Sequence, residues 1–158
     1  MAIAPTGQAA GLRPVTAQWQ GTGTADPDRA EATWTRRPFS VLLECEHGVD
    51  VLELPGRLTE RAVLALVAVD LRCPVAVLLY PSRWLLLTAT GDGPIPEFLP
   101  WPGASYRGAG TWMPLPPTNL GQSRARWHTD PTEGLPGAER VQRIIAASLH
   151  GPGVGGLR

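Results

Sequence analysis

The chain has 158 residues, of which 43% are hydrophobic and 18% charged, so it favours one domain with one core and excludes a fully disordered chain. Its 18 glycines and 17 prolines exclude a helical bundle or a coiled coil. The 14 basic residues balance 14 acidic ones, which argues against a strongly basic nucleic-acid-binding protein.

The apolar patterns predict short strands and two helices, in an order typical of an α+β domain. The expected strands span residues 40–45, 49–54, 75–80, 83–89, 105–107, 112–115 and 124–127. The expected helices span residues 60–69 and 138–149, with a helical turn at 95–99. We expect a largely antiparallel sheet with both helices on one side.

Three of these elements have specific signals. Thr59 precedes the first helix as its predicted cap, and this helix is apolar nearly all round, so we expect it to be buried against the sheet. Pro81 and Ser82 separate two β-rich runs and predict a hairpin. Apolar residues at 141, 144, 145 and 149 give the last helix one buried face.

Outside this region the composition changes. Residues 1–32 are rich in small and polar residues without periodicity, so they are expected to be disordered, with a folded domain at 33–149 and a flexible tail at 150–158. Residues 1–15 lack the apolar run of a secretory signal, and no stretch is long enough to span a membrane. We therefore expect a soluble cytoplasmic protein without a membrane partner.

Residues suited to catalysis are few. All 14 basic residues are arginines, which excludes a lysine Schiff base or P-loop lysine. Cys45 and Cys73 are isolated, without metal-ligand spacing, and are predicted to be buried thiols. His47, His128 and His150 belong to no recognisable triad: His47 is expected in a solvated turn, His128 at a strand end and His150 in the tail. We predict no cofactor.

Acidic residues gather once along the sequence. They are Glu44, Glu46, Asp50 and Glu53. Asp50 and Glu53 are three residues apart, so a regular strand points them to opposite faces, whereas metal chemistry needs carboxylates that converge. The pattern favours a solvated acidic edge.

The stretch between Glu97 and Asp130 has no acidic residue and interleaves arginine with aromatic residues. It holds Arg107, Arg124, Arg126, His128, Trp101, Tyr106, Trp112 and Trp127. Two interpretations remain open: the arginines hold phosphates while aromatic rings stack bases, or the arginine stems pack on tryptophan. An open groove shared by Arg107, Arg124 and Arg126 would favour the first, and arginines lying flat on Trp112 and Trp127 the second.

Several motifs follow one another along the chain: Trp34-x-x-x-Pro38, the run 51–55 (VLELP), the hairpin 80–87 (YPSRWLLL), and 106–118 (YRGAGTWMPLPPT) followed by 124–127. In this order they resemble the motifs of bifunctional DNA primase–polymerase domains. This resemblance covers residues 34–127 and implies a primase-type α+β fold. The family's activity is the metal-dependent joining of nucleotides on a DNA template.

Residue by residue, the resemblance places the family's metal-binding acids at Leu52, Leu54 and Ser105, and its hairpin histidine near Trp84. All four are replaced, so the resemblance implies a catalytically silent domain. Such a domain would bind single-stranded nucleic acid, a nucleotide, or a replication or regulatory partner. The predicted contact residues are Arg83, Arg107, Arg124, Arg126 and Trp127.

Two alternatives belong to other classes. One is a protein-interaction module that has lost ligand binding. The other is an active metal-dependent nucleotidyltransferase with a rearranged site built from Asp50, Glu53 or Glu44, which a shift of the strand register would allow.

Overall fold

A computed structural model describes residues 41–45, 48–79, 82–116, 118–120, 123–129 and 135–150. The segment expected to be disordered, 1–32, and the expected tail from 151 onward lie outside the described residues. His150, expected in that tail, is instead the last residue of a helix. Its ring Nδ1 lies 2.8 Å from the carbonyl oxygen of Ala146, one turn earlier in the same helix.

The described elements form two antiparallel sheets and two helices. The strands are β1 (Val41–Cys45), β2 (Val49–Pro55), β3 (Val75–Leu78), β4 (Arg83–Ala89), β5 (Ser105–Arg107), β6 (Thr111–Leu115), β7 (Asn119–Leu120) and β8 (Ser123–Thr129). The helices are α2 (Gly56–Ala68) and α3 (Ala138–His150). One sheet has the order β5-β2-β4-β3-β8-β7, and β1 pairs with β6 in the other.

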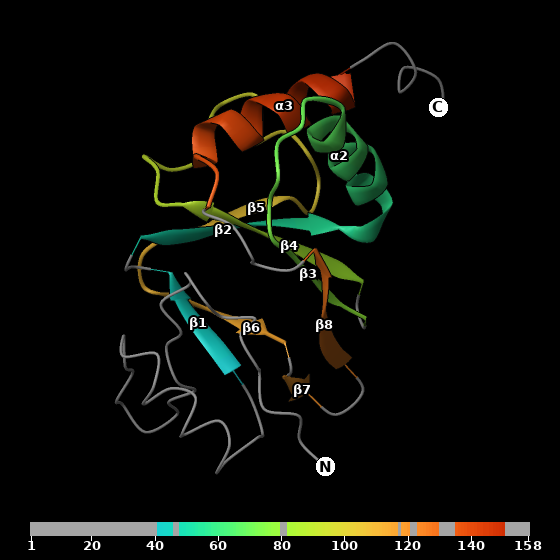
Figure 1. Cartoon of the computed structure of the whole chain (residues 1–158). Coiled ribbons are helices and arrows are strands. Elements are labelled where there is room, and N and C mark those ends of the chain that lie inside the picture. The colour runs from blue at the N-terminus through green and yellow to red at the C-terminus, as the bar shows by residue number, and fades with distance from the viewer. Residues whose placement is uncertain are drawn as a thin grey trace.

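The molecule has three layers, with the six-stranded sheet in the middle (Figure 1). The two helices lie together on one face of this sheet, and the β1–β6 pair lies on the other. Every strand pair in the described part is antiparallel. The predicted α+β class, with helices on one side of an antiparallel sheet, is confirmed.

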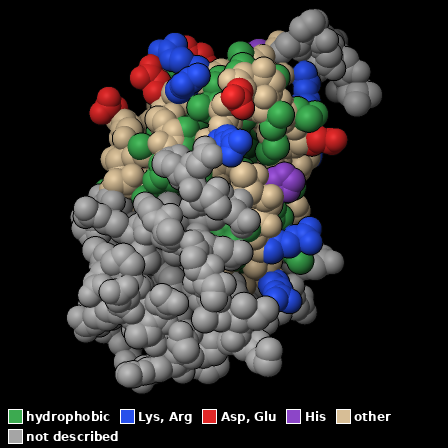
Figure 2. Space-filling model, viewed as in Figure 1, with side chains coloured by type: hydrophobic (Ala, Val, Ile, Leu, Met, Phe, Trp, Pro, Cys, Tyr) green, Lys and Arg blue, Asp and Glu red, His purple; other side chains and the backbone are tan. Residues whose placement is uncertain are grey.

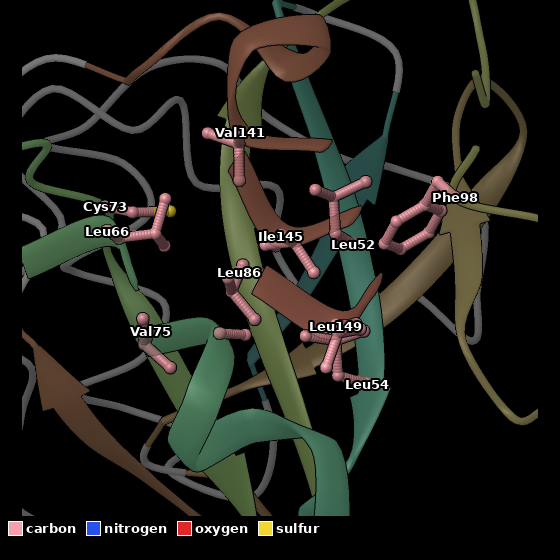
Figure 3. Close-up of a cluster of buried hydrophobic side chains, with 11 residues drawn as sticks. Leu52, Leu54, Leu66, Cys73, Val75, Leu86, Phe98, Val141, Ile145 and Leu149 are labelled. Atoms are coloured by element: carbon pink, nitrogen blue, oxygen red, sulfur yellow. The ribbon is translucent and has the colours of Figure 1, made fainter. Parts of the chain in front are cut away.

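Strand alternation divides the core into two clusters. Leu52 and Leu54 of β2 face the helices and pack with Val141, Ile145 and Leu149 of α3 (Figure 3). We call this cluster the helix-side core. Val49 and Val51 point the other way and pack against Leu43, Met113 and Leu115 of the β1–β6 pair. Strand β2 is therefore buried on both faces. Its two acidic side chains must each lie in one of the two cores, on the face that their position along the strand assigns.

The start of α2 corrects one expectation. The helix begins at Gly56, and the Thr59 hydroxyl donates to the Pro55 carbonyl, 3.1 Å away, instead of capping the helix. The Gly56 N–H is satisfied by the Ser82 carbonyl at 3.1 Å. A Cβ atom on Gly56 would lie 2.4 Å from the Ser82 hydroxyl oxygen, so this close approach requires glycine. The hairpin turn therefore replaces the expected side-chain cap.

The burial of α2 corrects a second expectation. Only one stripe of this helix is buried, at Thr59, Ala62 and Leu66. Leu64, Val67 and Val69 are 61%, 68% and 48% exposed. The helix lies on the outside of the sheet, so an apolar residue pointing directly away from the core has no described neighbour to cover it.

The two cysteines behave as predicted. Cys45 and Cys73 are both buried and unbridged. Burial raises the pKa of the Cys73 thiol to about 12, and its sulfur lies 3.3 Å from the Leu87 carbonyl oxygen. A thiol held protonated in this way is a poor nucleophile at neutral pH.

Candidate nucleic-acid interface

The predicted contact residues do not gather in one place. Arg83 of β4 and Arg107 of β5 lie on the two strands that flank β2, and both reach Glu53. Arg107 donates through Nε and a terminal nitrogen to the same Glu53 oxygen, at 2.9 and 2.8 Å. Arg83 Nε lies 3.5 Å from the other oxygen. We call Glu53, Arg83, Ser105 and Arg107 the Glu53 cluster.

Ser105 completes this cluster, since its hydroxyl donates to Glu53 at 3.0 Å. The strand register explains this convergence, because Glu53 is directly opposite Ser105 of β5 and Leu85 of β4. Arg107 and Arg83 are each two positions from these partners, so their side chains point to the same face as Glu53. Arg83 also donates to the Gly103 carbonyl at 2.9 Å. Both arginines are thus occupied by structural partners.

The expected solvated acidic edge is wrong for the two acids of β2. Asp50 and Glu53 are only 2% and 8% exposed. They do point to opposite faces, as the strand parity predicts. The Glu44 side chain and all of Glu46 lie outside the described residues. A buried carboxylate must find donors, and on each face of β2 the neighbouring strand or loop supplies them.

Asp50 has its own donors on the helix side of the sheet. The Gly91 N–H donates to its carboxylate at 2.9 Å, and the Tyr106 hydroxyl donates to the same oxygen. Burial and this bond to Asp50 raise the pKa of Tyr106 to about 12. Asp50 therefore ties β5 and the 91–93 loop to the central strand. No pattern in the sequence indicated that Asp50 and Tyr106 form a pair.

The remaining predicted arginines lie on β8. Arg124 and Arg126 are exposed and are two positions apart on the strand, so their side chains share a face. Arg126 pairs with Val77 of β3, which pairs in turn with Trp84 of β4. Trp84 packs against the helix-side core, so this row of three places the arginines on the helix side of the sheet.

His128 joins this face through a β-bulge. Trp127 pairs with Ala76 and Thr129 with Val75, which leaves His128 as the extra residue of β8. Its ring lies 4.8 Å from the Trp84 ring, centroid to centroid, at 58°. We call Arg124, Arg126, His128 and Trp84 the arginine face. Figure 2 shows blue and purple side chains gathered over β8.

Within the described part of the chain, neither Arg124 nor Arg126 has an ion-pair partner. The helices lie over the β2–β4 half of the sheet, and β8 extends beyond them (Figure 1). The two guanidinium groups are therefore presented to solvent beside two aromatic rings.

Trp127 lies elsewhere. It packs against the core on the β1–β6 side, on the face opposite Arg124 and Arg126. Side chains alternate between the two faces along a strand, which correctly predicted opposite faces for Asp50 and Glu53. The same alternation predicts that Trp127 points away from the face of Arg124 and Arg126. The five predicted residues thus occupy three locations: the Glu53 cluster, the arginine face and the core. Trp84 takes the place beside the arginines that was expected for Trp127.

The positions taken from the primase–polymerase resemblance also fall on two faces. Leu52 and Leu54 are fully buried beneath the helices (Figure 3), with Trp84 directly across from Leu54. Ser105 lies on the opposite face, bonded to Glu53. Among the described residues, no three His, Cys, Asp or Glu side chains gather closely enough to hold a metal ion.

No described helix is long and apolar enough to cross a membrane. Comparisons with protein-family models, curated proteins and solved structures find no match for this chain.

Proposed function

We propose that this chain is a non-catalytic, cytoplasmic domain that binds single-stranded nucleic acid along β8. The observation that carries the proposal is the arginine face: two exposed arginines without a described ion-pair partner, next to the Trp84 and His128 rings. Two buried, unbridged cysteines fit a reducing compartment.

The geometry fits a single strand better than a duplex. Side chains two residues apart on a strand are separated by roughly 6.8 Å, close to the spacing of successive phosphates in an extended nucleic-acid strand. Arginine binds phosphate bidentately, and stacking on aromatic rings is available only to bases that are not held in a duplex. Trp84 and His128 supply ring surface on the same face.

The resemblance to primase–polymerase domains supports the same ligand class, because those domains act on a DNA template. It also supports the loss of catalysis. The positions that it assigns to metal-binding acids are Leu52 and Leu54, whose side chains have no donor atoms for a metal and are fully buried.

Fluorescence anisotropy with a labelled single-stranded oligonucleotide tests the proposal. We expect weak binding at low salt that Arg124→Ala/Arg126→Ala weakens by about tenfold or more, as loss of two phosphate contacts implies. The matched control is Arg61→Ala/Arg140→Ala, which removes two exposed arginines from the helices and should leave binding unchanged. Absence of binding at low salt, or equal affinity in both double variants, would overturn the proposal.

The catalytic alternative needs its own assay. Purified protein with Mg²⁺ or Mn²⁺, a primed template and nucleotides should show no extension. Metal-dependent incorporation that Glu53→Gln abolishes would instead establish an active site built on a rearranged acid, and the non-catalytic part of the proposal would be wrong.

A specific observation favours the second candidate, a protein-interaction module. Leu64 and Val67 of α2, and Val69 directly after it, expose apolar side chains. Leu64 belongs neither to the arginine face nor to its described neighbours. Leu64→Glu would therefore abolish such an interaction without changing oligonucleotide affinity.

A further inference from the structure

A small cavity lies beside the arginine face, where the end of α2 meets β3 and β8. Its volume is about 200 Å³, and its lining is largely apolar. Val63, Leu66 and Val67 of α2 form one wall, and Val75 and Thr129 belong to the strands. The loop that follows the helix, residues 70–73, completes the lining.

The strand register places this cavity next to Arg126. Val75 pairs with Thr129, and Val77 pairs with Arg126. The cavity and the arginine are therefore one two-residue step apart along β3, roughly 6.8 Å. Arg124, Arg126 and the cavity follow one another along β8 at about the repeat of an extended nucleic-acid strand.

The size of the cavity limits what it can hold. Pockets that bury a drug-sized ligand have roughly 300–1,000 Å³, so this one suits a single ring system. Apolar walls match the faces of a nucleobase, whereas the sugar and phosphate of the same nucleotide would remain on the strand outside.

Asp70 adds a carboxylate to the largely apolar lining, shortly after the end of α2. The residue has φ = 50°, the left-handed conformation that ends many helices and that glycine or asparagine favours. Its N–H donates to the Val67 carbonyl at 3.0 Å, which fixes the backbone. Within the described chain no residue pairs with its carboxylate. The carboxylate therefore stands at a fixed place in the cavity lining, where it can accept hydrogen bonds.

We propose that this cavity binds one base of the single strand held by the arginine face, and that it prefers guanine. The inference rests on the proposed function. A carboxylate only accepts hydrogen bonds, so it favours an edge with two adjacent donors. Guanine presents its ring N–H and its amino group side by side. On the pairing edges of adenine, cytosine and thymine, a donor is next to an acceptor.

Anisotropy with four oligonucleotides of equal length tests the inference. Each is a thymine strand with the central base kept as thymine or replaced by guanine, adenine or cytosine. We expect the guanine strand to bind about tenfold more tightly, since a bidentate base contact contributes about 1.4 kcal/mol or more.

The test variant is Asp70→Gly, which removes the carboxylate and suits the left-handed backbone, so the fold is retained. It should reduce the preference for guanine, measured as the ratio of the guanine-strand to the all-thymine affinity of the same variant, to within about twofold. Asp92→Gly, which removes another exposed acid, is the matched control and should keep the full preference.

The outcomes separate the two proposals. If all four strands bind equally and Arg124→Ala/Arg126→Ala abolishes binding, the base-binding inference is wrong and the proposed function stands. If no strand binds at low salt, both are wrong. A guanine preference that survives Asp70→Gly would place the base outside this cavity.

Discussion

Two pairs of arginines belong to the same sheet and have opposite environments. Arg83 and Arg107 flank β2 and share the buried Glu53, whereas Arg124 and Arg126 lie on β8 and are open to solvent. Three of the four come from a stretch without acidic residues. What separates them is whether the neighbouring strand offers a carboxylate on the same face. An arginine's role in this fold therefore depends on its strand partner more than on its sequence neighbours.

Replacing one arginine of each pair by alanine should reveal the largest difference between the two pairs. Arg107→Ala leaves the Glu53 carboxylate buried with only Ser105 and a longer contact to Arg83, so we expect a loss of about 2 kcal/mol in the free energy of unfolding. This is below the usual penalty for breaking a buried ion pair because the Arg107 side chain is 43% exposed. Urea unfolding measures the change.

The matched variant is Arg126→Ala, which removes the same side chain from an exposed strand position. It should alter the free energy of unfolding by less than about 0.5 kcal/mol. Equal losses in the two variants would mean that Glu53 does not depend on Arg107, and the contrast between the two arginine pairs would disappear.

The two buried carboxylates of β2 extend the comparison to the other face. Asp50 has only two described side-chain hydrogen bonds, from the Gly91 N–H and the Tyr106 hydroxyl, while the Glu53 cluster supplies more donors. Tyr106→Phe should therefore lower the free energy of unfolding by about 1–2 kcal/mol, the penalty for removing one partner of a buried group. Chemical denaturation monitors it.

Ser105→Ala is the paired measurement, because it removes one hydroxyl donor from Glu53 and leaves both bonds from Arg107. Its effect should be smaller than that of Tyr106→Phe. The reverse order would show that Ser105, and not the arginine, is the principal partner of Glu53.

Much of the fold could be predicted from the sequence, because periodicity is a local property. The strands at 49–54, 83–89 and 105–107 and the last helix lie where the β-rich runs and the 3.6-residue pattern place them. The two-residue strand β7 was missed because so short a strand has no pattern of its own.

The candidate site was less predictable, for two reasons. Parity along β8 was available in the sequence and would have removed Trp127 from the site. The bond of Arg107 to Glu53 was not available, because it depends on β5 pairing with β2 across more than 50 residues of chain. Acid-free stretches in a sequence are therefore weak indicators of free arginines in a sheet protein.

The salt dependence of oligonucleotide binding shows how many arginines contact phosphates, and so tests the contrast between the two arginine pairs. If only Arg124 and Arg126 contact phosphates, the logarithm of the affinity for a single strand should fall with the logarithm of salt concentration at a slope of about −1.4. Participation of Arg83 and Arg107 as well would double that slope. Arg124→Ala alone should bring it to about −0.7. Anisotropy titrations at several salt concentrations give the slope, and a slope unaffected by Arg124→Ala would contradict the assignment.

The smallest expected effect concerns the proton of Tyr106. The chain has two tyrosines, so a Tyr80→Phe variant leaves Tyr106 as the only source of tyrosinate absorbance. Burial, reinforced by the hydrogen bond to Asp50, raises the pKa of Tyr106 from 10.0 to about 12, so tyrosinate should form in the native protein only near pH 12. An absorbance titration measures this, and a transition at pH 10 would show that the hydroxyl is not held by Asp50.

The sign of the linked stability change follows from the direction of the shift. A pKa that is higher in the folded state than in the unfolded state adds stability below the unfolded value, and this stability is lost as pH rises from about 10 to 12. The Cys73 thiol, whose pKa rises from 9.0 to about 12, adds a similar loss that begins about one pH unit lower. Thermal unfolding of Cys73→Ala between pH 9 and pH 12 removes that contribution. The residual slope should then become smaller on adding Tyr106→Phe, and an unchanged slope would show that Tyr106 does not contribute to it.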